Sequence, residues 1–286
     1  MISTDLGLAD LEAKATNVRL RVLDQVQVAG SGHYGSSLSL AEILVALYYT
    51  FLNVDPDHPD ADDRDRLILS KGHGCSALYA VLADLGFMDP QHLETFTRLG
   101  SILGDHPDVK KVPGVDFSSG SLGHGLSVGV GMATAQRHRD FDSCTVVVHG
   151  DGEMNEGQVW EAAAYAGAHK LDNLLVIIDR NQVQVDGTTE EILDFEPVAD
   201  KWEAFGWQVG SVDGHNLTEL CEALARFRAT PRGGLNRPTV IIANTTAGKG
   251  IDFIEGDAAW HVGYLHGVDN DEAIRQITSM YDHSGS

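Results

Sequence analysis

Cysteine, basic residues and long apolar runs are all scarce in this sequence. Its three cysteines, Cys75, Cys144 and Cys221, lie far apart with no CxxC spacing, which argues against a disulfide framework or a structural zinc site. Only 20 lysines and arginines stand against 42 aspartates and glutamates, a formal net charge of −22, so DNA and anionic membranes are poor partners. No apolar segment approaches the roughly 18 residues of a membrane span, and residues 1–26 do not resemble a signal peptide. These absences predict a soluble, acidic, cytoplasmic protein.

Continuous apolar runs predict four strands in the second half of the chain: Cys144–His149, Leu174–Asp179, Trp207–Val212 and Pro238–Asn244. Runs of this kind are typical of strands buried on both faces of a parallel sheet. Helical patterns lie between them, over Glu156–His169, Val198–Phe205 and Leu217–Phe227. The first half reads as more helical, over Leu8–Val28, Leu38–Phe51, Ser76–Leu85 and Leu126–Arg139. The sequence thus predicts an α/β fold, a mostly parallel sheet flanked by helices, and one domain over residues 1–286.

The stretch GDGEMNEGQVW, which starts at Gly150, directly follows one of these strands. The carboxyl edge of a parallel sheet is where open α/β folds bind ligands, and amides at a helix start favour phosphate oxygens. Asp151, Glu153 and Glu156 would repel phosphate unless a cation lay between them. Mg²⁺ accepts carboxylate, amide and phosphate oxygens, so the turn is predicted to bind a divalent cation and a phosphate-bearing ligand.

A second metal ligand is expected from the next strand, which runs into DRNQVQVDG. Asn181 follows Asp151 by the length of one strand–helix–strand unit, roughly 30 residues, so both should lie at the same edge. A lone GDG more often marks a tight turn with a solvated acid. The matching position of Asn181 favours a metal–diphosphate site instead.

The pair GDGEMNEG…DRNQ resembles the thiamine diphosphate (ThDP) motif, and its surroundings resemble the N-terminal half of transketolase. Further stretches match in family order over nearly the whole chain: GHYGSSLSLAEILVALYY, LSKGHGCSALYAVLADLG, GDHPD, PGVDFSSGSLGHGLSVGVGMA, ADKWEAFGW and RPTVIIA. The resemblance implies the ThDP-binding fold, with this chain as the diphosphate-binding domain. It also implies a transferase that moves a two-carbon ketol unit from a ketose or ketose phosphate to an aldose.

The same resemblance implies ligands for the metal and contacts for the cofactor. Asp151, the side-chain oxygen of Asn181 and the backbone carbonyl of Val183 would ligate Mg²⁺, or Ca²⁺ or Mn²⁺ in its place. Contacts with ThDP are implied for Gly120, Leu122, Gly150, Asp151, Gly152, Glu156, Asn181, His73 and His261. Gly120 and Leu122 would contact the aminopyrimidine, and the Gly152 amide would approach the diphosphate. Glu156 would lie in an interface network near the partner chain's active-site carboxylate.

Four histidines match the catalytic histidines of the family: His33, His73, His106 and His261. A lone histidine is usually a surface or core residue, but His33 and His73 lie in glycine-flanked SGHYG and KGHG loops. Ketol transfer requires proton movement and alkoxide stabilisation, which suit imidazoles that titrate near neutrality. We expect His33 and His261 to hydrogen-bond the donor's carbonyl and hydroxyl, with His73 beside C2 of the cofactor.

Three residues depart from the family's pattern. Arg180 stands where many ThDP enzymes have the first Asn of an Asn–Asn pair, of which only the second is expected to bind metal. His124 replaces a more usual glutamine near the pyrimidine, and Ala247 replaces a common lysine. The segment AWHVGYLHG begins like the family's WHG segment and then diverges. These changes bear on substrate specificity more than on ThDP binding.

Full-length transketolase is much longer than this chain. Its middle domain supplies the glutamate that protonates the aminopyrimidine, the aromatic residues that stack on it and most basic residues for sugar phosphate. The resemblance therefore implies a split enzyme. A separate subunit with the pyrimidine-binding and C-terminal domains would complete each site, in an α2β2 heterotetramer. The expected ligands are small sugars, with no nucleic acid and no membrane.

Other interpretations stay open. GSGHYG, from Gly30 to Gly35, fits the GxGxxG dinucleotide fingerprint, which needs a preceding strand and a helix opening inside it. Glu12–Val28 reads as helix instead, and SSLS is expected to separate the last glycine from the next helix. A ThDP enzyme with acyloin-type chemistry, or one acting on an unusual sugar in a specialised pathway, is a second alternative. A non-catalytic scaffold is a third, although intact Asp151 and Asn181 argue against it.

Overall fold

The centre of the molecule is a five-stranded, all-parallel sheet in the order β1-β2-β3-β7-β6. A computed structural model describes residues 6–230 and 236–281. The strands are β1 (Arg66–Leu69), β2 (Thr145–Gly150), β3 (Leu174–Arg180), β7 (Thr239–Asn244) and β6 (Gln208–Asp213). Four of these strands, all except β1, begin and end within one residue of the predicted apolar runs. The runs were recognisable because strands buried on both faces show no alternation of polar and apolar residues.

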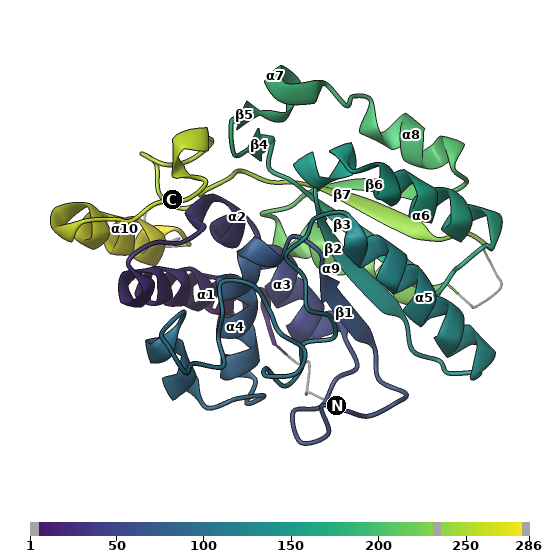
Figure 1. Ribbon diagram of the computed structural model, residues 1–286, viewed down its shortest axis with the longest axis horizontal. Coiled ribbons are helices and arrows are strands. Elements are labelled where there is room, and N and C mark those ends of the chain that lie inside the picture. Colours follow the sequence, from purple (N-terminus) through teal and green to yellow (C-terminus); the bar gives the residue numbers. More distant parts are fainter. Residues whose placement is uncertain (1–5, 231–235, 282–286) are drawn as a thin grey trace.

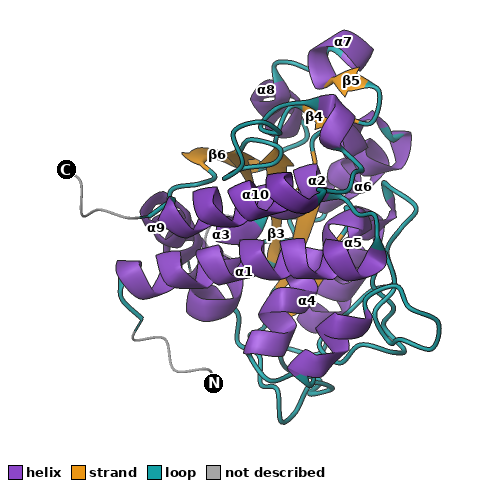
Figure 2. Ribbon diagram, turned by 90° about the vertical axis from the view of Figure 1, so that its left-hand side faces the viewer, coloured by secondary structure: helices purple, strands orange, loops and turns teal. Residues whose placement is uncertain are grey.

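Helices cover both faces of the sheet, and alternate strand residues belong to different layers (Figures 1 and 2). Val146 and Val148 pack in one layer, while Val147 packs in the other. The first layer holds α1 (Leu8–Ala29), α2 (Tyr34–Ser39), α3 (Ala41–Ala46), α4 (Cys75–Asp84), α9 (Leu217–Ala229) and α10 (Gly267–Ser279). The second holds α5 (His124–His138), α6 (Gly157–Ala168) and α8 (Val198–Ala204). The predicted α/β class is confirmed.

Short elements lie mainly at the carboxyl edge of the sheet. A small hairpin of β4 (Val183–Gln184) and β5 (Gly187–Thr188) leads into α7 (Thr189–Leu193), which projects beyond the sheet in Figure 1. Short 3-10 helices span Gly72–Gly74, Pro90–Thr95, Gly152–Asn155 and Ala258–Trp260. Within the described ranges, no helix is both long enough and apolar enough to span a bilayer.

Several sequence-based expectations differ from the structure. The helix expected over Leu38–Phe51 is divided: α2 ends at Ser39, α3 follows, and Leu47–Phe51 forms a π-helical turn. SSLS does not separate Gly35 from a helix, because α2 already begins at Tyr34. The segment before GSGHYG is nevertheless α1 rather than a strand, so the dinucleotide fingerprint still lacks its context.

A buried group of polar side chains, the Glu42 cluster, joins α1, α3 and the C-terminal part of the chain. Its members are Arg19, Glu42, His215 and Tyr281. Arg19 donates to both Glu42 oxygens, at 2.6 and 2.8 Å, and both side chains are fully buried. His215 lies 2.9 Å from the second Glu42 oxygen, and Tyr281 donates to the first. Burial alone would raise the pKa of Glu42, but Arg19 and His215 outweigh it and lower the pKa to about 2.

Candidate active site

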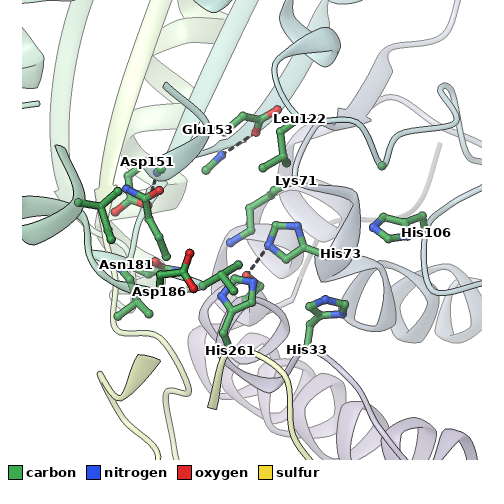
Figure 3. Close-up of a pocket in the computed structure, with 18 residues that line it drawn as sticks. His33, Lys71, His73, His106, Leu122, Asp151, Glu153, Asn181, Asp186 and His261 are labelled. Atoms are coloured by element: carbon green, nitrogen blue, oxygen red, sulfur yellow. Dashed lines mark hydrogen bonds between the residues drawn. The ribbon is translucent and has the colours of Figure 1, made fainter. Parts of the chain in front are cut away.

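A cavity of about 370 Å³ opens at the carboxyl edge of the sheet, where β2 and β3 end (Figure 3). Its lining includes most residues that the sequence singled out: His33, His73, His106, Gly120, Leu122, Gly150, Asp151, Gly152, Asn181, Val183 and His261. They come from loops far apart in the sequence, because parallel strands bring their carboxyl ends to one edge. Glu156 is the exception: it is exposed and lies outside this lining.

Asp151 and Asn181 lie side by side because Gly150 pairs with Asp179 in the sheet. One Asp151 carboxylate oxygen accepts from the Gly152 amide at 2.7 Å, and the other from the Gln182 amide at 2.6 Å. Asn181 Oδ1 accepts from the Val183 amide at 3.1 Å. Both side chains are buried, so their oxygens are held at the cavity wall by the backbone.

The environment of Asp151 is unfavourable for a bare carboxylate. Burial and the neighbouring Asp179 raise the pKa of Asp151 to about 6, although two backbone amides and Lys71 act in the opposite direction. Within the described ranges, Asp151 forms no salt bridge with a protein cation. A divalent metal ion would supply the missing positive charge, and carboxylate and amide oxygens are the hard donors that Mg²⁺ prefers.

The other potential ligands are neutral oxygens. Among the described residues, no three of His, Cys, Asp or Glu are grouped so that they could hold a metal. The predicted set of Asp151, the Asn181 carboxamide and the Val183 carbonyl contains only one such residue, so it is compatible with this finding. A Cβ at Gly152 would meet the Gln184 side chain at 2.7 Å, so only glycine allows this close packing of the turn. The residues present therefore suit a metal-bound anion.

Glu153 lines the cavity, but protein donors already occupy both of its carboxylate oxygens. Its side chain is buried and turns inward to accept hydrogen bonds from Ser70, Gly123 and Gly150. Local sequence did not reveal this role, because Glu153 looks like one more acid in an acidic turn. Its partner Ser70 lies 83 residues away, after a strand that the apolar runs did not reveal, so no local signal pointed to this contact.

Lys71, in the cavity wall, forms a buried ion pair with Asp179, which the sequence patterns did not predict. Lys71 Nζ donates to one Asp179 oxygen, which also accepts from Ser39 at 2.7 Å. Thr245 donates to the other oxygen. Lys71 is the only lysine or arginine among the described cavity-lining residues. Its charge is already balanced by Asp179, so it leaves the region of Asp151 acidic.

The four predicted histidines form a cluster at the mouth of the cavity (Figure 3). The ring centroid of His33 lies 5.3 Å from that of His73, 6.3 Å from that of His106 and 5.7 Å from that of His261. His73 Nε2 lies 2.7 Å from the Ser36 hydroxyl. His33 Nδ1 lies 3.4 Å from a carboxylate oxygen of Asp105. The imidazoles thus surround one space from several sides.

Titration near neutrality, expected from the sequence, is not found for three of these imidazoles. Burial, His33 and Lys71 lower the pKa of His261 to about 4. Burial, followed by Lys71 and the neighbouring histidines, lowers the pKa of His73 well below its ordinary value. The pKa of His106 is also lowered, by desolvation and by His33 against the opposing effect of Asp105. These rings are therefore neutral near pH 7 and act as hydrogen-bonding groups.

An isolated antiparallel bridge joins the first and last histidine loops. Gly32 and Gly263 exchange backbone hydrogen bonds of 3.0 and 2.9 Å, which places His33 and His261 close together. A Cβ added at Gly32 would lie 2.5 Å from the Val26 side chain, and a Cβ added at Gly263 would lie 2.8 Å from the Trp260 ring. Neither position has room for a side chain.

The three residues that depart from the family's pattern are not among the residues that line the cavity. Arg180 pairs with Glu196 and donates to Asn244 at 3.1 Å. His124 is exposed at the start of α5. Ala247 is buried, with its Cβ 3.7 Å from the position that a Cβ would take at Gly35.

Comparisons with known proteins agree on one family. The family described as "Transketolase, thiamine diphosphate binding domain" matches residues 11–284. The 6-deoxy-6-sulfo-D-fructose transketolase subunit of Clostridium sp. is 44% identical over 88% of this chain and 90% of its own length. An apulose-4-phosphate transketolase subunit of Phocaeicola vulgatus is 41% identical over 95% of each chain.

Single-chain transketolases match over only part of their length. The crystal structure of the transketolase of Campylobacter jejuni aligns with a TM-score of 0.88 and 33% identity, covering 96% of this chain and 43% of that one. Human transketolase is 37% identical over 96% of this chain and 43% of its own length. This chain therefore has the extent of the named subunits and less than half that of the single-chain enzymes.

Proposed function

Since this chain belongs to the transketolase family as a thiamine diphosphate-binding domain, we propose that it is the cofactor-binding subunit of a two-component transketolase. It would transfer a two-carbon ketol unit from a ketose or ketose phosphate to an aldose, together with a partner subunit. The observation that carries the proposal is the placement of Asp151 and Asn181 at one sheet edge, opposite a cluster of four histidines.

The diphosphate would be held through a metal ion at the end of β2. Asp151, Asn181 and the Val183 carbonyl would ligate Mg²⁺, with Ca²⁺ or Mn²⁺ as substitutes. Gly150 and Gly152 would allow the diphosphate to approach the backbone, and Gly120 and Leu122 would contact the aminopyrimidine. Glu156, which lies outside the cavity, would belong to an interface with the partner subunit.

Bound ThDP would supply the nucleophilic carbon and the electron sink for carbon–carbon bond cleavage. This chain's own residues would bind and orient the sugar. His33 and His261 would hydrogen-bond the carbonyl and hydroxyl groups of the donor, and their fixed geometry would favour the oxygen on which negative charge develops. His73 and His106 would complete the polar wall, with the Ser36 hydroxyl fixing one His73 nitrogen at 2.7 Å.

The active complex would need a second chain. Relatives named as subunits are matched over 90–98% of their length, and single-chain enzymes over 43%. We infer that residues 1–286 act as one domain and that an α2β2 assembly with a chain carrying the pyrimidine-binding and C-terminal domains completes each site. The cytoplasmic location expected from the sequence stays a prediction.

The anionic group of a sugar substrate would be recognised mainly by that partner. Lys71 is the only lysine or arginine among the described cavity-lining residues, and Asp179 neutralises it. The two subunit relatives are named for a sulfonated sugar and for a phosphorylated sugar, so we propose an anionic ketose as the donor class. Acyloin-type carboligation stays the alternative chemistry.

The decisive experiment measures cofactor binding and turnover in the complex with its partner. Asp151→Ala should abolish metal-dependent ThDP binding in isothermal titration calorimetry, and the chain alone should show no ketol transfer even with Mg²⁺ and ThDP. Unchanged affinity of the variant would refute the ligand assignment. Rapid turnover by the isolated chain would refute the need for a partner.

The reaction class can be tested with the same complex. We expect transfer of two carbons from xylulose 5-phosphate or a related anionic ketose to an aldose, followed by mass spectrometry of the products. A product formed by joining two acyl donors, with no ketose consumed, would favour the acyloin-type alternative.

A further inference from the structure

Three separate segments of the cavity wall converge on the side chain of Glu153. One carboxylate oxygen accepts from the Ser70 hydroxyl and from the Gly123 amide, the latter at 2.8 Å. The other oxygen accepts from the Gly150 amide at 3.1 Å. Ser70 follows β1, Gly123 precedes α5, and Gly150 ends β2. One carboxylate therefore joins the end of β1, the start of α5 and the end of β2.

Each hydrogen-bonded residue is next to a residue of the candidate site. Ser70 precedes Lys71 and the His73 loop, and Gly123 follows Leu122. Gly150 precedes Asp151. Figure 3 shows Glu153 beside Leu122, with its hydrogen bond to Gly150 dashed. A shift of the carboxylate would therefore move three walls of the cavity relative to one another.

The surrounding packing gives these contacts little freedom. A Cβ at Gly125 would lie 2.2 Å from the Ser70 hydroxyl oxygen, so the α5 backbone packs directly on that serine. Gly123 has a positive φ of 84°, and a Cβ there would lie 2.7 Å from the Glu156 Cβ. Both donors to the first oxygen are thus confined by glycine-dependent packing.

The bonding of Glu153 depends on its being a carboxylate. Both of its oxygens face donors, and in the described part of the chain it has no salt bridge to lysine or arginine; His149 Nδ1 lies 3.6 Å from its second oxygen. A glutamine of the same shape would replace one acceptor by a donor. The NH₂ group would then oppose either the Gly150 amide or the Ser70 and Gly123 donors, and a buried donor would lose its partner.

We propose that Glu153 is a positioning residue that sets the spacing of the three cavity walls, and through it the affinity for ThDP. This inference rests on the proposed function, which assigns the diphosphate to the Asp151 wall and the aminopyrimidine to the Leu122 wall. Both Glu153 oxygens are occupied by hydrogen bonds from the protein, so its proposed role is to hold the two walls at the separation that the cofactor must span.

The test uses Glu153→Gln and Ser70→Ala, with Glu203→Gln as the control. Glu203 is an exposed acid on α8, so its variant removes the same charge and leaves the cavity unchanged. Hydrogen exchange of the purified chain should be about tenfold faster at residues 70–74, 119–123 and 149–153 in Glu153→Gln. Peptides from α10 should exchange at the wild-type rate, and the control should match wild type throughout.

Cofactor affinity gives the second measurement, made on the complex with its partner in excess Mg²⁺. Glu153→Gln should bind ThDP about tenfold more weakly, and Ser70→Ala about threefold more weakly. The double variant should lose less than the product of the two factors, because both changes remove the same contact. If Glu153→Gln does not fold, hydrogen exchange and ThDP affinity of Ser70→Ala test the proposal instead.

Two outcomes would overturn the proposal. Exchange that accelerates equally in all peptides would mean that Glu153 only stabilises the fold. ThDP affinity within twofold of wild type in correctly folded variants would mean that the spacing does not govern binding. If wild-type complex itself fails to bind ThDP, the proposed function falls, while the exchange data still judge the positioning role.

Discussion

Glu42 in the helical layer and Asp151 in the cavity are both buried carboxylates, but their charges are balanced differently. Glu42 is paired with Arg19 at 2.6 Å, and its pKa is lowered to about 2. Asp151 accepts only backbone amides, and its pKa is raised to about 6. The first acid is neutralised within the chain and holds helices together. The second is left with a charge deficit that a bound cation would remove, which is typical of a functional site.

The strongest test of this comparison breaks the Glu42 cluster. Glu42→Gln would leave Arg19 buried without its counter-charge, so we expect the free energy of unfolding to fall by about 3–5 kcal/mol in urea denaturation. Asp62→Asn is the matched control, because Asp62 forms an exposed ion pair with Arg139 and its loss should leave the free energy of unfolding almost unchanged. Equal losses in the two variants would remove the distinction between buried and surface pairs.

The converse change is made in the cavity. Asp151→Asn removes an unfavourable buried charge but leaves one backbone amide, of Gly152 or Gln182, without its acceptor. These two effects oppose each other, so the free energy of unfolding should stay within about 1 kcal/mol of wild type. Binding of ThDP with Mg²⁺ should nevertheless weaken by about 100-fold or more, because the anionic metal ligand is lost. Calorimetry and denaturation of the same preparation check both numbers. A large loss of stability with little loss of binding would make Asp151 a structural acid like Glu42.

A third test uses pH. The pKa of His261 is lowered from 6.5 to about 4 in the folded chain, so between these values the unfolded chain takes up a proton that the folded chain does not. Wild type should therefore lose stability as pH falls from 6.5 to 4, by about 2 kcal/mol after allowance for solvent screening. His261→Asn should lack this part of the pH dependence. If the free energies of unfolding of wild type and His261→Asn differ by the same amount at every pH from 7 to 4, the lowered pKa of His261 is contradicted.

The smallest expected effect refines the Glu42 cluster. Tyr281→Phe removes one hydrogen bond to Glu42 and leaves the Arg19 pair intact, so we expect a loss of about 1 kcal/mol in the free energy of unfolding. A loss as large as that of Glu42→Gln would mean that Tyr281, and not the ion pair, holds the cluster together.

Local sequence patterns predicted the long central strands of the sheet well, but they did not predict the short edge strand β1 or the helix α10. β2 and β3 were found because they are long apolar runs that end in polar residues. β1 was missed because it is four residues long and follows a charged stretch. α10 was not predicted, since it is mostly polar and only Ala273 and Ile277 of its residues are buried.

The sequence likewise predicted some features of the candidate site and not others. The convergence of Asp151 and Asn181 followed from strand topology, because the ends of adjacent parallel strands meet at one edge. The inward turn of Glu153 and the Lys71–Asp179 pair did not follow, since each depends on a partner from a distant loop. The lowered pKa of His73 also depends on three-dimensional burial, which the flanking glycines in KGHG do not reveal.

The bridge between Gly32 and Gly263 limits where this chain can tolerate a change of length. One residue inserted between His261 and Gly263 would break the register of that bridge or rotate the imidazole away from His33. The same insertion after Gly263 would fall in the connection to α10 and leave the paired glycines in place. Loop grafts or tags in this part of the protein should therefore begin beyond Leu265, because that side chain is buried and its carbonyl accepts from Gln27 at 2.8 Å.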